Sequence, residues 1–124
     1  MTNPRTELLS NRASPLIESE FRAMYMVALE NGLASVGKHL SRVAVDFITR
    51  KYGIAPNETY RSPAFLSESL KKILGSMGAV LVETRILASL YSQMEIASPI
   101  PSVRAGHPED FEKSLTELVG IITY

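Results

Sequence analysis

Two charged residues, Glu83 and Arg85, stand inside the most apolar stretch of the chain, residues 78–94. A carboxylate buried among apolar side chains has a raised pKa and can act as an acid or a base. On a helix, however, side chains two positions apart diverge by about 200°, so these two do not share a face. We therefore expect each to reach water at the rim or an opposite charge on a neighbouring helix, as a structural ion pair.

The other residues that could do chemistry are isolated from one another. His39 and His107 lie far apart with no second ligand at helical metal spacing, and the chain has no cysteine. The serines at predicted helix starts or exposed faces are Ser10, Ser14, Ser41, Ser62 and Ser67. No G-x-S-x-G elbow accompanies them, and the glycines at 75 and 78 match no phosphate-binding loop. We expect no enzyme, no cofactor and no metal.

Charge is biased locally although the formal net charge is zero. A candidate interaction surface consists of the basic residues Lys38, Arg42, Arg50, Lys51 and Arg61. The last predicted helix is acidic, with Glu109, Asp110, Glu112 and Glu117. These two faces can be solvated, or can attract one another within the domain or between two copies. A nucleic-acid-binding regulator using the basic face is an alternative, but the helix that would enter the groove is the most apolar one.

Apolar periodicity and end signals predict an all-α fold, a compact domain of five helices. The expected helices are at about residues 15–35, 38–52, 63–75, 78–95 and 108–123. Proline in the first turn begins the first, third and fifth of them, and Gly53 ends the second. Residues 1–13 are expected to form a flexible N-terminal segment, residues 54–61 a loop and residues 75–78 a tight turn. We find no convincing strand.

The helix at 78–94 is predicted to be central because its apolar residues cover more than one side. Val80, Leu87, Tyr91 and Met94 lie on one side and Val82, Ile86 and Leu90 on another, with Leu81 between them. The predicted buried stripe of the second helix is Leu40, Val43, Ala44, Phe47 and Ile48.

The last helix follows a proline-containing linker and has one apolar stripe. This stripe consists of Phe111, Leu115, Leu118, Val119 and Ile122. It can fold back onto its own core, which is the default, or it can act as an association stripe against a second copy or another protein.

A chain of 124 residues is long enough for one core. No run approaches the ~18 apolar residues of a membrane span, and the N-terminus lacks the pattern of a secretory signal. We expect a cytoplasmic protein without a membrane partner.

A resemblance covers about residues 27–94. The segments ALENGL (28–33), KYGI (51–54), SPAFLSESLKKILG (62–75) and GAVLVETRILASLY (78–91), with Gly37, resemble a small archaeal signalling output domain of unknown function, the Nitrosopumilus output domain. The shared positions are glycines at helix ends and apolar core residues, so they concern the fold and transfer no catalytic residue. The resemblance implies a helical interaction domain in regulation.

The sequence therefore predicts a non-enzymatic protein-interaction module in signalling or regulation, whose partner is another protein or a second copy in a homodimer. A third alternative, a small-ligand sensor with an apolar cavity between helices, leaves no trace in the sequence.

Overall fold

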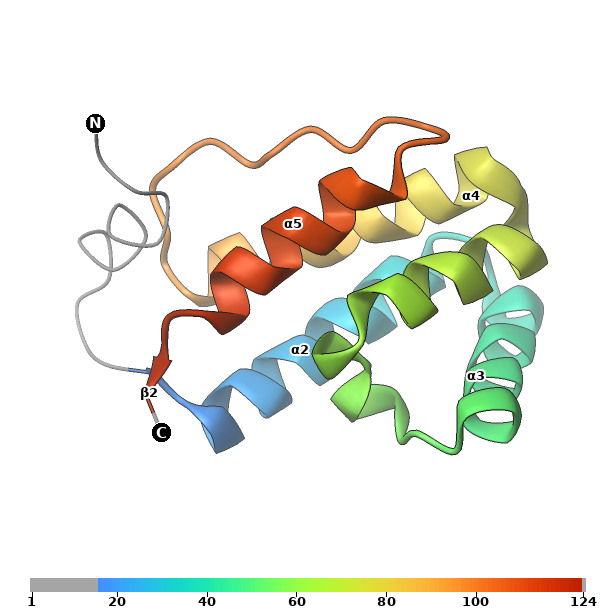
Figure 1. Cartoon of the computed structure of the whole chain (residues 1–124), viewed down its shortest axis with the longest axis horizontal. Helices are drawn as coiled ribbons and strands as arrows, with labels where there is room; N and C mark the ends of the chain where they lie inside the picture. Colours follow the sequence, from blue (N-terminus) through green and yellow to red (C-terminus); the bar gives the residue numbers. More distant parts are fainter. Residues whose placement is uncertain (1–15, 124) are drawn as a thin grey trace.

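The structure is a computed structural model that describes residues 16–123; Ser14, Pro15 and the predicted flexible segment lie outside the described residues. The fold is all-α, as predicted (Figure 1). Its helices are α2 (Glu18–Ala34), α3 (Lys38–Tyr52), the 3-10 helix η1 (Pro56–Arg61), α4 (Pro63–Gln93) and α5 (Pro108–Val119). Two short strands, β1 (Leu16–Ile17) and β2 (Ile122–Thr123), complete the described chain.

The long element α4 is two antiparallel arms joined at Gly75, which has φ 77° and ψ 172°. Ser67 and Glu83 are hydrogen-bonded at 2.7 Å, whereas a straight helix would separate two residues sixteen apart by about 24 Å. The first arm is residues 63–74 and the second arm is residues 76–93. The predicted tight turn between two helices is confirmed. It consists of one residue, Gly75, whose backbone conformation only glycine adopts readily.

The second arm of α4 lies at the centre of the fold and contacts α2 and α5 (Figure 1). The side chains of Val82, Ile86, Leu87 and Leu90 are fully buried, and those of Tyr91 and Met94 nearly so. The prediction of a central helix is confirmed. Leu81 is an exception, because its side chain is 41% exposed.

Helix α2 crosses this second arm at Gly32. A Cβ atom at Gly32 would lie 2.9 Å from the Val82 carbonyl oxygen and 3.0 Å from Ile86 Cγ1. The missing side chain lets the two backbones approach closely where α2 crosses α4. Glycine inside a helix costs stability, and here the cost is offset by this contact.

The two ends of the described chain meet in a short parallel pairing, Leu16 with Ile122 and Ile17 with Thr123. The prediction of helix from about residue 15 is wrong, because Leu16 and Ile17 are extended and Leu16 is buried. The last helix likewise ends at Val119 instead of residue 123. Strands are predicted from an alternating apolar pattern, and a strand of two residues is too short to show one.

The segment predicted as a loop between α3 and α4 contains η1. Its Thr59 and Tyr60 are buried against α2. The Tyr25 hydroxyl is hydrogen-bonded to the Thr59 hydroxyl at 2.7 Å, and the Tyr60 hydroxyl donates to Glu18 at 2.9 Å. Polar partners from α2 therefore hold η1 in place.

The apolar stripe of α5 folds back onto its own core. Phe111, Leu115 and Leu118 are fully buried, Ile122 is nearly so, and Val119 packs against the same cluster. The default alternative is confirmed, and these side chains are not free to form an association stripe with another chain.

Candidate functional site

Helix α3 is the least covered helix of the fold and lies at one end of it, steeply inclined to α2 (Figure 1). Only Ala44 and Ile48 of its predicted stripe are buried. Leu40 is 40% and Val43 39% exposed, so the prediction that both are buried is wrong. The reason is that α3 contacts its neighbours along a narrow line, and its apolar arc is wider than that line.

The exposed part of this arc forms a surface of its own. Exposed Leu40 and Val43 and half-buried Phe47 follow one another at steps of three and four, so they lie on one helix face. A shallow hollow of about 530 Å³ runs over this face, lined by Val43, Asp46, Phe47, Arg50 and Lys51. We call the residues Leu40, Val43, Phe47, Arg50 and Lys51 the α3 surface.

The five basic candidates do not form one patch. Arg61 lies on η1, where its guanidinium pairs with Glu18 and lies over the Tyr60 ring. Lys51 lies 3.9 Å from the Glu68 carboxylate and 5.2 Å from the centre of the Phe47 ring.

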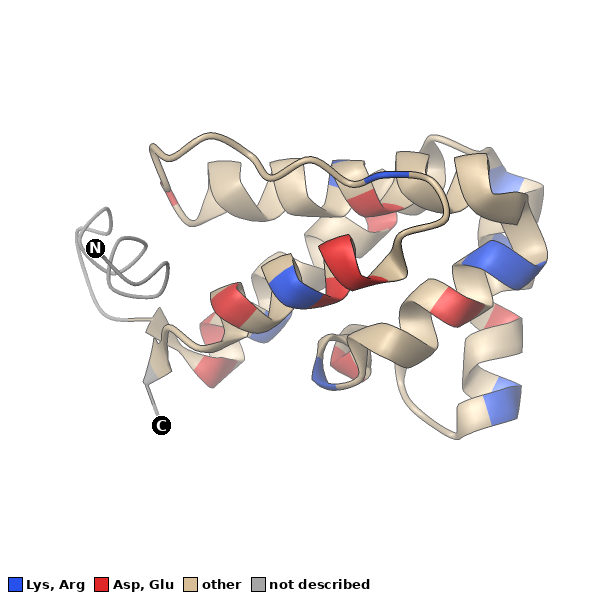
Figure 2. Ribbon diagram, turned by 45° about the horizontal axis from the view of Figure 1, so that its top comes forward, with Lys and Arg blue, Asp and Glu red and all other residues tan. Residues whose placement is uncertain are grey.

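The other three candidates, Lys38, Arg42 and Arg50, are exposed on α3 and form no ion pair within residues 16–123. In Figure 2, basic segments lie at the end of the molecule that carries α3 and the turn of α4, while the charged segments of α5 are mostly acidic. The basic and acidic segments predicted from the sequence therefore also lie in different parts of the structure.

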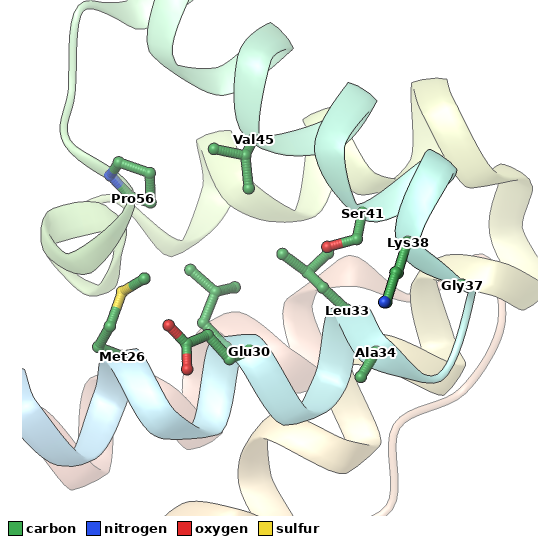
Figure 3. A pocket seen from close by; sticks show the side chains of 10 residues that line it. Met26, Glu30, Leu33, Ala34, Gly37, Lys38, Ser41, Val45 and Pro56 are labelled. Carbon is green, nitrogen blue, oxygen red and sulfur yellow. The ribbon is translucent and has the colours of Figure 1, made fainter.

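A second feature near α3 is a cleft of about 460 Å³ between α2 and α3 (Figure 3). Its apolar lining comes from Met26, Leu29, Leu33, Ala34, Val45 and Pro56, and its polar lining from Glu30, Lys38 and Ser41. Pro56, at the start of η1, closes the side opposite the α2–α3 turn. A cavity between helices was the third alternative, although no residue of the sequence indicated its place; this cleft has the size of a small-molecule site.

Glu83 is the one acidic side chain buried in the described core, 2% exposed. It accepts a hydrogen bond from Ser67, which is itself buried, contrary to the prediction of a helix-start or exposed serine. Burial raises the pKa of Glu83 to about 7, the Ser67 hydrogen bond opposes this rise, and the nearby charges of Glu112 and Asp110 add to it.

The prediction of a structural ion pair at Glu83 is wrong within the described chain, where no salt bridge includes it. Arg104, which lines the adjacent small cavity, is held by Asp110 through contacts of 2.8 and 3.0 Å. That cavity measures about 20 Å³, which is room for roughly one water molecule. The cavity beside Glu83 is therefore too small for a ligand larger than a water molecule. Arg85, by contrast, is exposed, as expected for a rim residue.

The histidines are separate from Glu83 and from each other. His39 is exposed on α3. His107 occupies the N-cap position of α5 but makes no capping hydrogen bond; its Nδ1 lies 2.9 Å from Glu109 instead. Within residues 16–123 there is no cluster of three or more His, Asp or Glu side chains that could hold a metal ion.

By length and composition, α4 is the one described helix that could cross a membrane, with a mean hydropathy of 1.5 over 18 residues. That length is divided at Gly75 between two arms that run in opposite directions. The 31 residues of α4 therefore do not form one straight apolar helix.

Comparisons of the chain with protein-family models, with curated proteins and with solved structures give no match. The resemblance to the archaeal output domain accordingly stays a prediction.

Proposed function

We propose that this protein is a non-enzymatic interaction module that binds another protein through the α3 surface. The observation that supports it most is the exposure of Leu40 and Val43 on a helix that lies at the end of the fold. Large apolar side chains that recur at positions i, i+3 and i+7 are the anchors with which a helix enters an apolar groove. In α3 these anchors are Leu40, Val43 and Phe47.

The charges beside the anchors define the partner. Arg50 and Lys51 project on opposite sides of the apolar stripe, because they lie about 60° before and 40° after Phe47 on the helix circumference. Because Lys51 already has an acidic partner in Glu68, we infer a partner with an apolar groove and an acidic side chain on the rim that faces Arg50. Such complementarity raises the association rate and selects the partner.

A nucleic-acid-binding regulator is the less favoured alternative. Phosphate binding needs several free cations, and two of the five candidates already have acidic partners, Lys51 with Glu68 and Arg61 with Glu18. Exposed Leu40 and Val43 add nothing to phosphate binding, whereas they suit an apolar groove. The cytoplasmic and signalling setting of this proposal comes from the sequence alone.

The test is capture of partners from a native extract by the tagged chain, with and without nuclease, using matched variants. Leu40→Ser and Val43→Ser remove apolar anchors, and Ile100→Ser removes an equally exposed apolar side chain, 45% exposed, in the linker. We expect a protein that survives nuclease, is lost with both α3 variants and is retained with Ile100→Ser.

Direct binding then measures the effect. The purified partner should bind Val43→Ser at least about tenfold more weakly, as for an anchor residue. Arg50→Glu should slow association, whereas Arg85→Glu, a charge reversal on α4, should not. Capture that is equal for all variants would reject the α3 surface, and capture that disappears with nuclease would favour the nucleic-acid alternative. If the retained protein is the chain itself, the partner is a second copy.

A further inference from the structure

The cleft between α2 and α3 lies on a different face of α3 from the α3 surface. Ser41 and Val45 point into it from α3, and Leu33 and Met26 point into it from α2 (Figure 3). The anchors Leu40, Val43 and Phe47 are not among its lining residues. An inference about this cleft is therefore independent of the proposed protein partner.

The cleft is partly enclosed between two helices and has a volume of about 460 Å³. Buried Leu29 and Leu33 contribute to its lining from α2. It stays open because α3 diverges from α2 and because the facing residues Ala34 and Ser41 are small. Sites of this size and apolar lining typically bind small molecules.

The polar groups of the cleft have opposite sign at its two ends. Lys38 lies beside Ala34, whereas the carboxylate of Glu30 lies toward Met26 and Pro56 (Figure 3). Lys38 is also the first residue of α3, so its ammonium group adds to the positive end of the helix dipole. The end of the cleft near Lys38 therefore favours an anionic group, and the end near Glu30 disfavours one.

Several donors at the Lys38 end lack partners among the described residues. No side chain caps α3, whose first turn contains no acidic residue. The backbone N–H groups at the start of a helix have no intrahelical acceptor. The Ser41 hydroxyl, which lines the cleft, makes no hydrogen bond within residues 16–123. One carboxylate could accept hydrogen bonds from this group of donors.

We propose that the cleft binds a small amphipathic monocarboxylate, with its carboxylate at Lys38 and Ser41 and its apolar body along Leu33 toward Met26 and Pro56. We infer a ligand with only one carboxylate because Glu30 would repel a second one at the other end of the cleft. The occupant is thus an aliphatic or aromatic acid with one charged head and an uncharged tail.

The test uses ligands that share a ten-carbon chain and differ only in their end groups. Decanoate, decanol, decylamine and the dicarboxylate decanedioate are titrated calorimetrically into the full chain. We expect decanoate to bind at least about tenfold more tightly than the other three, since it alone combines a carboxylate for Lys38 and Ser41 with an uncharged tail near Glu30. In amide NMR spectra, decanoate should shift the signals of residues 38–41 most.

Matched variants locate the site. Lys38→Glu should weaken decanoate binding at least about tenfold and leave decanol binding unchanged, whereas Lys113→Glu on α5 should leave both unchanged. Ser41→Leu and, at an exposed position that tolerates change, Ala34→Met should fill the cleft and weaken every ligand. Thermal unfolding of each variant confirms that it is folded.

Three outcomes would overturn the proposal. Failure of decanoate to bind would show that the cleft does not take this class of ligand. Equal affinity for the acid, the alcohol and the amine would remove the role of Lys38. Binding that survives both filling variants would show that the ligand binds elsewhere. None of these outcomes bears on the α3 surface, which is tested with different variants.

Discussion

The hydroxyl group of Ser67 donates a 2.7 Å hydrogen bond to the carboxylate of Glu83, across the two arms of α4. Both side chains are buried beneath α5 and its preceding linker, whose Arg104 lines the adjacent cavity. A buried carboxylate is costly when ionised, so the protonation of Glu83 favours this contact between the two arms. Gly75 supplies the turn and Ser67 the hydrogen bond that make this arrangement possible.

We expect the stability of the domain to fall between pH 4.5 and 7 because of Glu83. Below pH 4.5 its carboxyl is protonated in the folded and the unfolded chain. Above that pH the unfolded chain releases the proton, while the folded chain holds it up to about pH 7. The raised pKa therefore corresponds to stability that is present at low pH and lost as the pH rises, by about 3 kcal/mol at most.

Glu83→Gln removes this titration. At pH 8 it should be more stable than the wild type by up to about 3 kcal/mol, and near pH 4.5 the two should differ little. Denaturant unfolding at a series of pH values measures the difference. Glu20→Gln, at an exposed carboxylate of α2, is the control and should leave the pH profile unchanged. Identical pH profiles for wild type and Glu83→Gln would contradict the assignment.

Gly75→Ala should destabilise the monomer by about 1–3 kcal/mol, because a side chain is strained at positive φ. Straightening α4 relieves this strain, and the separated arms can then pack with those of a second molecule, as in domain swapping. We expect a dimeric fraction in size-exclusion chromatography with light scattering. Gly53→Ala, at φ 63° at the end of α3, is the control: it should be destabilised and remain monomeric.

Gly32→Ala should destabilise the domain although alanine favours helix. The gain in helix propensity is about 1 kcal/mol, but the new methyl group would meet the Val82 carbonyl oxygen at 2.9 Å. Because that atom belongs to the backbone of a buried helix, α2 and α4 must move apart and lose packing. A lower melting temperature in circular dichroism is expected. An unchanged or higher melting temperature would mean that the two helices can separate at no cost.

Leu115→Ala should cost about 2–5 kcal/mol, the range for a buried leucine, since Leu115 is a fully buried residue on the inner face of α5. Leu81→Ala, the same change at a leucine that is 41% exposed, is the control and should cost much less. Removing all residues after Ile96 should abolish cooperative unfolding in calorimetry. A truncated chain that still unfolds cooperatively would show that α5 is not part of the core.

Local signals in the sequence were sufficient for most element boundaries. The bounds of α3, the start of α4 at Pro63, the turn at Gly75 and the start of α5 at Pro108 all agree with the structure. Each depends on a proline or a glycine whose backbone preference acts over one or two residues. The Ser62 hydroxyl, although at the N-cap, makes no capping bond.

Features that depend on distant parts of the chain were not predictable in this way. The apolar residues of α3 are compatible with a buried helix and with a half-exposed one. Which of them are buried depends on the angle at which α3 packs against α2 and α4, and that angle is not encoded locally. The burial of Glu83 depends on Ser67 and on α5, which are sixteen or more residues away. The cleft depends on the divergence of two helices, for which the sequence carries no local signal.

The pairing of Leu16 with Ile122 also sets an order of events during protein synthesis. Ile122 is added 106 residues after Leu16, which takes roughly 5–20 s at the usual rate of translation. During that time α2 emerges from the ribosome with Phe21 and Tyr25 uncovered, because η1, whose Tyr60 packs on both rings, has still to follow it. The domain can close only once its last residues have left the exit tunnel, so the nascent chain is a natural client for chaperones until that moment.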